Sequence, residues 1–455
     1  MIGLALVLQW LVLAAAALPF LGRRDASLFH PYTLYLVFHA LVFVLRPMAV
    51  HLLGFDEQWG YMRFTPTDTQ FVRTLLVAAV GLLAFAAGSL LAGRPPAGTA
   101  DAEGSPLPAP TPAQLTAFAA TVAALLPLAL YGAYRDALIF GTLAAPGEAG
   151  MFEPAGSNET YFRNTTAYVV KAHNLLVPLA ALTAWLGRFR AWSLVPVALV
   201  VGYRVYLGSR WGMVLVLGIV LLLLLHRQGL RWPPLRMALL ALPLLVGFHV
   251  VGENRDVLRN ALGVGEQRYE RAARNWPRGL AKYDTPSFAN FDFLAYVVAV
   301  VPERSHTYTY FTQHLELFTR PVPRMFWPGK PKSAPVEFVD LNRYGWFGKR
   351  TVALVGDGWM SAGWLGVVIT CGGAGWLLAR AYHWFAARRE RLFPVALYCC
   401  YLPTSVLWFR GGELVGAVRY GAWMVLPVLI WWGLSALLTH VQAHRAGART
   451  DGAAP

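Results

Sequence analysis

The feature that most constrains this chain is a succession of apolar runs, each close to the roughly 20 residues with which an α-helix crosses a bilayer. About eleven runs occur, at residues 2–20, 31–53, 71–92, 114–134, 164–186, 191–207, 211–225, 235–251, 359–380, 393–409 and 420–439. Hydrophobic residues make up 56% of the 455 residues, far outside the range of a soluble domain. We therefore expect an all-α polytopic integral membrane protein with about 11 transmembrane helices.

The charges beside these runs predict the orientation of the chain. The first run, residues 1–20, carries no charged side chain, and Arg23 and Arg24 follow it. A cleaved signal peptide has its positive charge before the apolar core, so we expect an uncleaved first helix with its N-terminus outside. Counting spans from there places the arginine-rich short loops and the C-terminal tail on one side, which the positive-inside rule makes the cytoplasm.

The predicted spans divide the chain into four parts. They are an N-terminal membrane region with about eight helices (1–251), one large extracytoplasmic loop (252–358), the C-terminal helices (359–440) and a disordered cytoplasmic tail (441–455). Connections as long as this loop are usually functional. Its middle, Phe291 to Pro302, is apolar but too short to span, so we expect a re-entrant or interfacial element.

Cations and prolines gather in one stretch of this loop, "FTRPVPRMFWPGKPK" from Phe318 to Lys332. Each proline fixes φ and removes a backbone donor, so the stretch is predicted to be stiff and extended. Its positive side chains suit an anionic head group at the membrane surface. Simple adhesion to anionic lipid is the alternative interpretation.

Two further arginine clusters lie on the predicted outer face. "GYRVYLGSRWG", residues 202–212, interrupts apolar sequence, and a second pair begins the large loop. Ionisable residues at the edge of a span are costly and indicate function by default, with snorkelling to lipid phosphates as the alternative. Guanidinium groups bind phosphate in bidentate fashion. The predicted diphosphate-binding set is Arg204, Arg210, Arg255, Arg259, Arg320, Arg324 and Lys330.

One region resembles a known family. "VVAVVPERSHTYTYFTQHLELFTRPVPRMFWPGKP" followed by "VALVGDGWMSAGWLG" is similar to the bacterial O-antigen polymerases (Wzy-type oligosaccharide repeat-unit polymerases), which are related to the O-antigen ligases. The family signature, PR-hydrophobic-WP-x-KP, is matched by Pro323, Arg324, Trp327, Pro328, Lys330 and Pro331. Asp357 stands where the family commonly has Glu. The resemblance covers residues 290–366, and elsewhere only topology and length agree.

The resemblance implies a GT-C-like membrane glycosyltransferase. Such an enzyme takes a glycan from undecaprenyl diphosphate on the outer face of the bacterial inner membrane. It transfers that glycan to the sugar of a second lipid-linked unit, and so builds O-antigen or exopolysaccharide. The implied partners are the lipid-linked donor and acceptor and membrane lipids, with no nucleic acid. Whether a chain-length regulator protein also takes part is left open.

The residues suit this chemistry independently of the family. Breaking a sugar–diphosphate bond places negative charge on the leaving group, which a metal or cations must stabilise. The loop contains no DxD-type pair of carboxylates for Mg²⁺ and is rich in arginine. The three cysteines also lie in predicted helices without metal or disulfide spacing. We therefore expect metal-independent transfer without a cofactor, inverting the donor carbon if no covalent intermediate forms.

The acceptor hydroxyl needs a general base. The predicted catalytic residues are Asp357, Glu253 and His314, and His306 and Glu337 are further candidates for the base. Glycines flank Asp357 and would let a sugar approach the backbone, although a helix N-cap is the alternative role for this residue. For His314 the alternative is a plain surface histidine. Aromatic side chains stack on sugars or belong to an interfacial belt, and the predicted sugar-binding residues are Tyr308, Tyr310 and Trp327.

Three alternatives stay open. An O-antigen ligase would move a finished glycan to a lipid A core, and a flippase would use the same arginines to carry a diphosphate. Transporters tend to show repeated halves and helices interrupted at the midplane. This chain shows no internal repeat, and its cations gather on one face, which favours surface chemistry. A non-catalytic scaffold would place its charges on an exposed protein-binding surface instead of near the bilayer.

Overall fold

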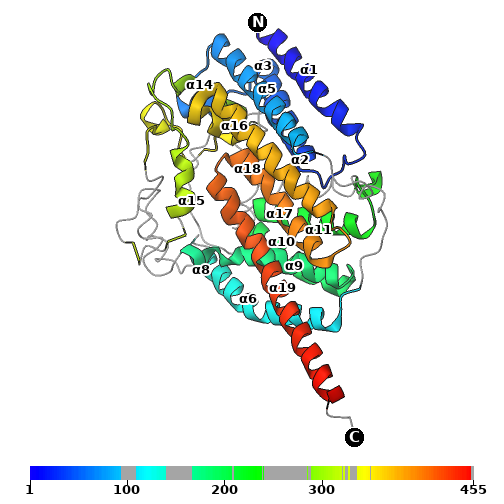
Figure 1. Ribbon diagram of the computed structural model, residues 1–455. Coiled ribbons are helices and arrows are strands. Elements are labelled where there is room, and N and C mark those ends of the chain that lie inside the picture. The colour runs from blue at the N-terminus through cyan, green and yellow to red at the C-terminus, as the bar shows by residue number, and fades with distance from the viewer. Residues whose placement is uncertain are drawn as a thin grey trace. The chain divides into compact units, whose positions relative to one another are not determined.

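A computed structural model describes most of the chain as helix (Figure 1). The described residues are 1–93, 109–139, 167–206, 210–237, 239, 284, 288–319, 321–322, 326–327, 336–348 and 350–451. No strand occurs among them. They form two compact units, which are described separately below. Unit 1 comprises Met1–Asp101, Arg271–Ala387 and Thr404–Arg419, and unit 2 comprises Ala102–Glu270, Arg388–Pro403 and Tyr420–Pro455.

Within the described residues, eight helices are long and apolar enough to cross a membrane. They are Ile2–Leu21, Pro31–Leu53, Asp68–Leu91, Pro112–Ala137, Tyr168–Leu186, Ala353–Ala386, Leu392–Gly411 and Leu414–His444. The prediction of an all-helical fold is therefore confirmed for the described residues, and the length and composition of these eight helices are consistent with a multi-pass membrane protein. The expected spans at 191–207 and 211–225 are shorter apolar helices. The expected span at 235–251 lies almost wholly outside the described residues, so the total of about eleven stays a prediction.

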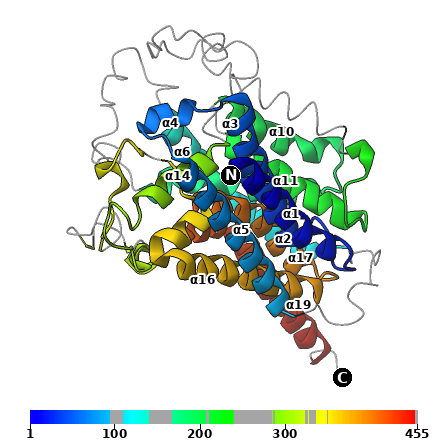
Figure 2. The same ribbon diagram turned by 90° about the horizontal axis from the view of Figure 1, so that it is seen from above.

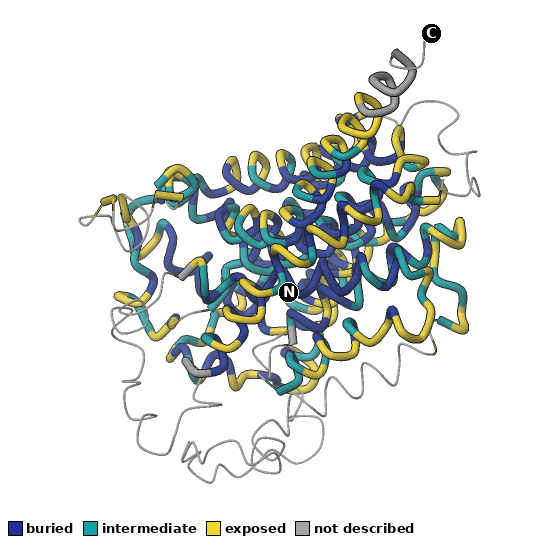
Figure 3. Tube along the Cα trace, turned by 90° about the horizontal axis from the view of Figure 1, so that it is seen from below, coloured by how far each residue is buried: buried dark blue, intermediate teal, exposed yellow. Residues whose placement is uncertain are grey.

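Unit 1 holds four of the eight long apolar helices whole. Its elements are α1 (Ile2–Leu21), α2 (Pro31–His39), the π-helix η1 (Ala40–Leu45), α3 (Arg46–Leu53), α4 (Glu57–Met62), α5 (Asp68–Leu91), α14 (Asn290–Val300), η5 (Thr312–Leu315), α15 (Glu316–Thr319), η6 (Leu341–Arg343), α16 (Ala353–Ala386) and α18 (Ser405–Gly411). α2, η1 and α3 follow one another without a break and make the second candidate span. The buried segments of the tube in Figure 3 mark the core.

Small residues bring α5 and α16 close together along their lengths (Figures 1 and 2). A side chain on Gly88 would collide with the backbone of Gly372, and one on Gly375 with the backbone of Phe85. Between lipid-embedded helices, such close backbone approach supplies the packing that the hydrophobic effect does not. Phe85 also stacks on Tyr35 of α2 at a ring distance of 4.0 Å, so three helices share one core.

The helix α14 occupies the place where we expected a re-entrant or interfacial element. Every residue from Asn290 to Val300 is buried. A helix lying at an interface would keep one polar face exposed, whereas α14 is enclosed by α5 and α16 and by other parts of unit 1. Its Tyr296 hydroxyl donates to the carbonyl of Leu341 at 2.8 Å, which fixes the η6 region of the loop on this buried helix.

The helix α16 begins at Ala353, six residues before the predicted span. Asp357 is consequently an internal residue of the helix. The N-cap position belongs to Val352, so the interpretation of Asp357 as an N-cap is wrong. The apolar run in the sequence begins only after Asp357, and the polar neighbours described below offset the cost of burying its carboxylate.

The same helix is broken a short distance further on. Ala362 (φ −163°, ψ 35°) and Gly363 (φ 59°, ψ −135°) depart from helical geometry. A positive φ with this ψ is open to glycine and strongly disfavoured for other residues. The break separates a short N-terminal segment, which carries Asp357, from the long remainder of α16.

Unit 2 is built from the remaining helices. They are α6 (Pro112–Ile139), α8 (Ala167–Lys171), η3 (Ala172–Leu175), α9 (Leu176–Leu186), α10 (Ala191–Tyr206), α11 (Arg210–Arg227), α17 (Leu392–Tyr401) and most of α19 (Leu414–Asp451), with η7 (Leu402–Thr404) between α17 and α18. α9 packs against both α10 and α11, and α6 packs against η3. α19 continues to Asp451 and so includes most of residues 441–455, for which we expected a tail without structure.

Candidate functional site

Four polar side chains of unit 1 form what we call the Asp357 site: Asp357 and Ser361 on α16, and Gln313 and His314 on η5. Gln313 Nε2 donates to Asp357 Oδ1 at 3.0 Å and to Ser361 Oγ at 2.8 Å. Ser361 Oγ in turn donates to the Asp357 carbonyl at 2.8 Å. His314 Nε2 lies 3.3 Å from Asp357 Oδ2. The structure thus brings together two of the predicted catalytic residues.

The break in α16 is what holds η5 against Asp357. Helix breaks release backbone groups that need new partners. The carbonyls of Met360 and Ser361 accept from the backbone N–H groups of Thr309 and Tyr310, at 2.8 and 3.0 Å. A side chain on Gly363 would meet the Tyr308 hydroxyl at 2.9 Å. The segment before η5 therefore packs directly on the broken turn.

A second set of contacts fixes the N-terminal segment of α16 from another side. The Trp359 indole Nε1 donates to the carbonyl of Val301 at 2.7 Å, at the end of α14. The guanidinium of Arg73 lies over the Trp359 ring, 5.1 Å from its centre, and forms an ion pair with Glu303. Asp357 is thus presented by a segment that is anchored to both η5 and α14.

The electrostatics of the site distinguish its two titratable groups. The His314 side chain is 24% exposed and the Asp357 side chain 7%. Burial alone would lower the pKa of His314, but its contact with the carboxylate and the negative charge of Asp357 outweigh burial, so the pKa of His314 is raised. A raised pKa moves a histidine towards the range in which a general base operates.

Two acceptor atoms of the site lack a hydrogen-bond donor in good geometry. Gln313 Oε1 is buried without a hydrogen-bond partner, and Asp357 Oδ2 faces His314 but has no well-aligned donor. Unpaired buried acceptors are uncommon and call for an explanation. Hydroxyl groups of a ligand would supply the missing donors.

Aromatic side chains lie on the same segment as η5. The ring of Tyr310 meets those of Tyr308 and Phe338 edge to face, at 6.2 and 5.8 Å. Tyr310 and Phe338 are 58% and 48% exposed, so their faces are available. Two of the predicted sugar-binding residues therefore adjoin the Asp357 site. Trp327, the third, is 40% exposed, and none of the contacts between described residues connects it to the site.

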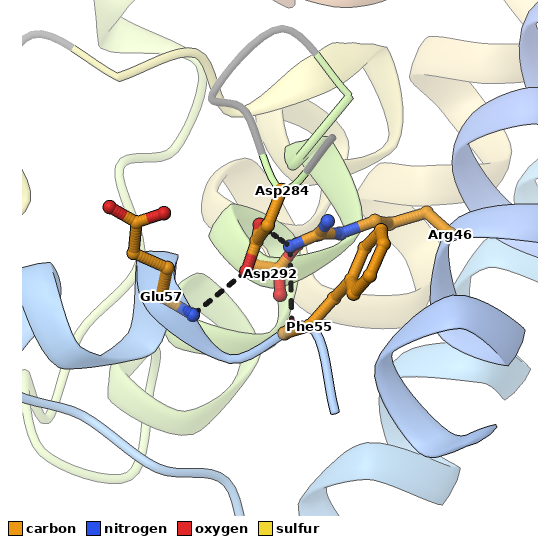
Figure 4. Close-up of polar contacts among 5 residues, drawn as sticks. All are labelled: Arg46, Phe55, Glu57, Asp284 and Asp292. Atoms are coloured by element: carbon orange, nitrogen blue, oxygen red, sulfur yellow. Dashed lines mark hydrogen bonds and ion pairs between the residues drawn. The ribbon is translucent and has the colours of Figure 1, made fainter. Parts of the chain in front are cut away.

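A second charged cluster in unit 1, the Arg46 network, was not predicted (Figure 4). Arg46 Nε lies 2.8 Å from Asp292 Oδ2, and Arg46 Nη2 lies 2.8 Å from Asp284 Oδ1. The Glu57 backbone N–H donates to the other oxygen of Asp284 at 2.9 Å. The three charged side chains are at most 5% exposed. Burial raises the pKa of Asp292 to about 6, in spite of the opposing charge of Arg46.

Arg204, the described member of the predicted diphosphate set, is buried in unit 2. Its exposure is 3%, and its Nη2 donates to Asn174 Oδ1 at 3.1 Å. Its guanidinium lies 5.6 Å from the centre of the Tyr203 ring. Asp136 Oδ1 lies 3.9 Å from Lys171 Nζ and 3.7 Å from His173 Nδ1. A side chain this buried does not snorkel to lipid phosphates, so that alternative does not apply to Arg204.

The other predicted site residues fall outside what the structure describes. They are Glu253, Arg255, Arg259, Arg320, Arg324 and Lys330, together with the side chain of Arg210. The proline-stiffened stretch is therefore described only at scattered positions. Of the further base candidates, His306 is exposed, and no contact among the described residues connects it to Asp357.

Sequence reasoning missed three residues of this region: Gln313, Ser361 and Phe338. A signal for two of them was present. Ser361 follows Asp357 by four positions, which places both on one face of a helix. Gln313 directly precedes the candidate base His314. Nothing in the sequence singles out Phe338.

Comparison of the chain with protein-family models, with curated proteins and with solved structures finds no match.

Proposed function

We propose that this chain is a membrane glycosyltransferase that polymerises undecaprenyl-diphosphate-linked oligosaccharide repeat units on the outer face of the bacterial inner membrane. The observation that carries the proposal is the contact of His314 with Asp357 at 3.3 Å. It joins a candidate base to a carboxylate within the region that resembles the O-antigen polymerases. Unpaired acceptors and exposed aromatic rings beside the pair suit a polyhydroxyl ligand.

His314 takes the role of general base. The Asp357 carboxylate orients the imidazole ring and raises its pKa. His314 is the more exposed of the two, and its Nε2 faces Asp357, so Nδ1 is left for the acceptor hydroxyl. The neutral imidazole takes the hydroxyl proton at Nδ1. The acceptor oxygen forms its bond to the anomeric carbon of the donor, and the bond from that carbon to the phosphate oxygen breaks. The bonding pair leaves with the diphosphate, and the donor carbon is inverted.

The neighbours of this pair suit the binding of the acceptor sugar. Gln313 Oε1 accepts a hydrogen bond from a sugar hydroxyl, while Gln313 Nε2 keeps Asp357 and Ser361 in place. The exposed rings of Tyr310 and Phe338 offer apolar faces for the C–H groups of a pyranose. Hydrogen-bond acceptors next to aromatic faces are a combination that suits carbohydrate better than an isolated anion.

Stabilisation of the leaving diphosphate falls to the cations of the family signature, Arg324 and Lys330. This half of the proposal rests on the sequence resemblance and on the need to neutralise the developing charge. It assigns no metal ion to the transfer step.

The experiment is polymerisation in proteoliposomes supplied with lipid-linked repeat units in the presence of EDTA. The native protein is compared with His314→Gln and Arg324→Ala, and with His51→Gln as a control, because His51 is an exposed histidine of the same unit. A glycan ladder made by the native and control proteins and lost in both variants supports the proposal. Transfer only to an added lipid A core identifies a ligase instead. Movement of unaltered units between leaflets without a ladder identifies a transporter and ends the catalytic assignments.

A further inference from the structure

At the other end of α16, unit 1 contains a second group of potential ligand atoms. Asp25 and His30 come from the connection between α1 and α2, and His383 comes from the last turn of α16. One ligand atom from each lies within 4.8 Å of the other two. His30 and His383 are only 2% and 7% exposed. Among the described residues this is the one group of three or more such side chains.

The fold holds these residues together through their neighbours. Tyr382 Oη donates to the carbonyl of Asp25 at 3.1 Å, and its ring centre lies 4.5 Å from that of His30. Phe29 stacks on Phe385 of α16 at 5.8 Å. The α1–α2 connection is therefore packed on the end of α16 in a defined position. A metal site at this position therefore needs no further ordering of the α1–α2 connection.

The buried imidazole of His383 needs a polar partner that the protein does not supply in good geometry. Among the described residues, neither of its buried ring nitrogens has a hydrogen-bond partner in good geometry, and the one polar neighbour that acts on the ring at close range is the backbone of Ala92. Leaving a buried polar group unpaired is unfavourable, because the group has given up its water on folding. A metal ion bound by one nitrogen would meet this need on the side where Asp25 and His30 lie.

We propose that Asp25, His30 and His383 bind a divalent first-row transition metal, of which Zn²⁺ is the best candidate. Two imidazoles and one carboxylate are a donor set that such ions accept, with the remaining position taken by water. Ligand atoms of a tetrahedral zinc site lie about 3.4 Å apart, as follows from metal–ligand distances near 2.0–2.1 Å. The three side chains must therefore close by roughly 1 Å or somewhat more on the ion, which rotation about side-chain bonds allows.

Two existing interactions change when the ion binds. His30 Nδ1 accepts from the backbone N–H of Tyr32 at 3.2 Å, and ligation through either ring nitrogen gives up this cap bond. Asp25 is held by Arg23 through two hydrogen bonds, at 2.9 and 2.7 Å. Such partners orient a ligating carboxylate, but the positive charge of Arg23 opposes the cation. Removal of that charge should therefore strengthen metal binding.

The proposed ion is separate from the transfer chemistry. Asp357 and His383 are 26 positions apart on α16, which is roughly 35 to 40 Å along a helix. The ion cannot touch the Asp357 site over that distance. Its effect would be to link the α1–α2 connection to the end of α16, so it stabilises unit 1 without entering catalysis.

The test uses the full chain without a histidine tag, purified in detergent, stripped with EDTA and then titrated with Zn²⁺ or Co²⁺ alone. We expect one ion per chain, a visible Co²⁺ absorption band and a rise of Tm with Zn²⁺. His383→Gln should weaken binding by at least about tenfold and abolish the Tm rise. Arg23→Gln should bind more tightly than the native protein.

The matched control is His39→Gln. His39 is also fully buried in unit 1 with both ring nitrogens unpaired, but it belongs to no such group of ligands among the described residues. Its loss should leave the metal content unchanged. Equal binding by His383→Gln, or no bound ion in the native protein, overturns the proposal. If His383→Gln does not fold, Arg23→Gln decides, since weaker or unchanged binding by that variant contradicts the site.

Discussion

The Asp357 site and the Arg46 network both place carboxylates inside the helical core of unit 1, but they differ in what surrounds the charges. In the Arg46 network one guanidinium holds two carboxylates, and the Asp292 side chain is completely buried. In the Asp357 site the carboxylate meets a histidine that is 24% exposed and a glutamine with an unpaired oxygen. Each cluster contains an orphan acceptor, Asp292 Oδ1 in the first and Gln313 Oε1 in the second. Only the second lies beside a side chain that water reaches.

This difference separates a structural charge cluster from a chemical one. A buried ion pair contributes little net stability, yet removal of one partner is strongly destabilising. The Arg46 network ties the second candidate span to α14, and each of its charged side chains is paired with another inside the core. The Asp357 site keeps a titratable group near solvent and leaves polar atoms for a ligand. A charge inside a membrane span is thus evidence of function only when its partners leave something unpaired and accessible.

Replacing His314 is expected to have the largest effect. His314→Ala should lower the rate of glycan polymerisation by about 10²- to 10⁴-fold, the usual contribution of a general base. Because the side chain is partly exposed, the free energy of unfolding should change by less than about 1 kcal/mol. Single-turnover assays and denaturant unfolding in micelles measure the two quantities. A rate loss that merely follows a loss of folded protein would assign His314 to structure.

The opposite pattern is expected for Arg46. Arg46→Met leaves two buried carboxylates without their cation, so the free energy of unfolding should fall by about 3–5 kcal/mol. The fraction that remains folded should keep its specific activity. Arg343→Met is the control, because the ion pair of Arg343 with Asp340 is exposed and should contribute about 0–1 kcal/mol. Equal effects of the two variants would show that the Arg46 network is not structural.

The broken turn of α16 is the mechanical support of the Asp357 site. Gly363→Ala puts a side chain at φ 59° and against the Tyr308 hydroxyl. We expect a cost of about 1–3 kcal/mol and a loss of activity larger than the loss of folded protein, because the segment before η5 must shift. Gly373→Ala on the same helix is the control, since nothing lies within 4 Å of its added carbon. Full activity of Gly363→Ala would show that the Asp357 site does not depend on the break in α16.

A smaller effect with a definite sign is expected for Asp292. Burial raises its pKa to about 6, so the folded protein holds this proton more tightly than the unfolded chain does. The stability that this proton contributes is present below pH 4 and is lost as the pH rises to about 6. Asp292→Asn should flatten the pH dependence of the free energy of unfolding over this range. It should lower that free energy by about 1 kcal/mol at pH 7, which is less than for Arg46→Met, because Arg46 still has its ion pair with Asp284. An unchanged slope would mean that Asp292 does not titrate there.

The helical membrane architecture could be predicted from the sequence because apolar length alone determines it. The helices at 2–21 and 31–53 agree with the predicted runs to within one residue. The start of α16 was misplaced because length and hydropathy do not show that Gln313 and His314 neutralise the cost of burying Asp357. The break at Gly363 was equally hidden, since a glycine in an apolar helix usually marks close packing.

The candidate site was predicted in part. Asp357 and His314 were selected for their chemistry, and the structure shows that they touch although they lie 43 positions apart in the chain; Gln313 and Asp357 are 44 positions apart. The Arg46 network could not be predicted, because it joins Arg46 to residues more than 200 positions away. Pairing at such separations is a property of the packed helices and leaves no local pattern in the sequence.

The most direct test of the central claim is the pH dependence of single-turnover glycosyl transfer by the native protein and by Asp357→Asn. Asp357 raises the pKa of His314, so the native rate should fall as the pH drops through that raised pKa and the base becomes protonated. Without the carboxylate the pKa of His314 should fall, and the acidic limb of the profile should move to lower pH, with a reduced plateau. An acidic limb that stays in place, or moves to higher pH, would contradict the pairing of His314 with Asp357 as the catalytic unit.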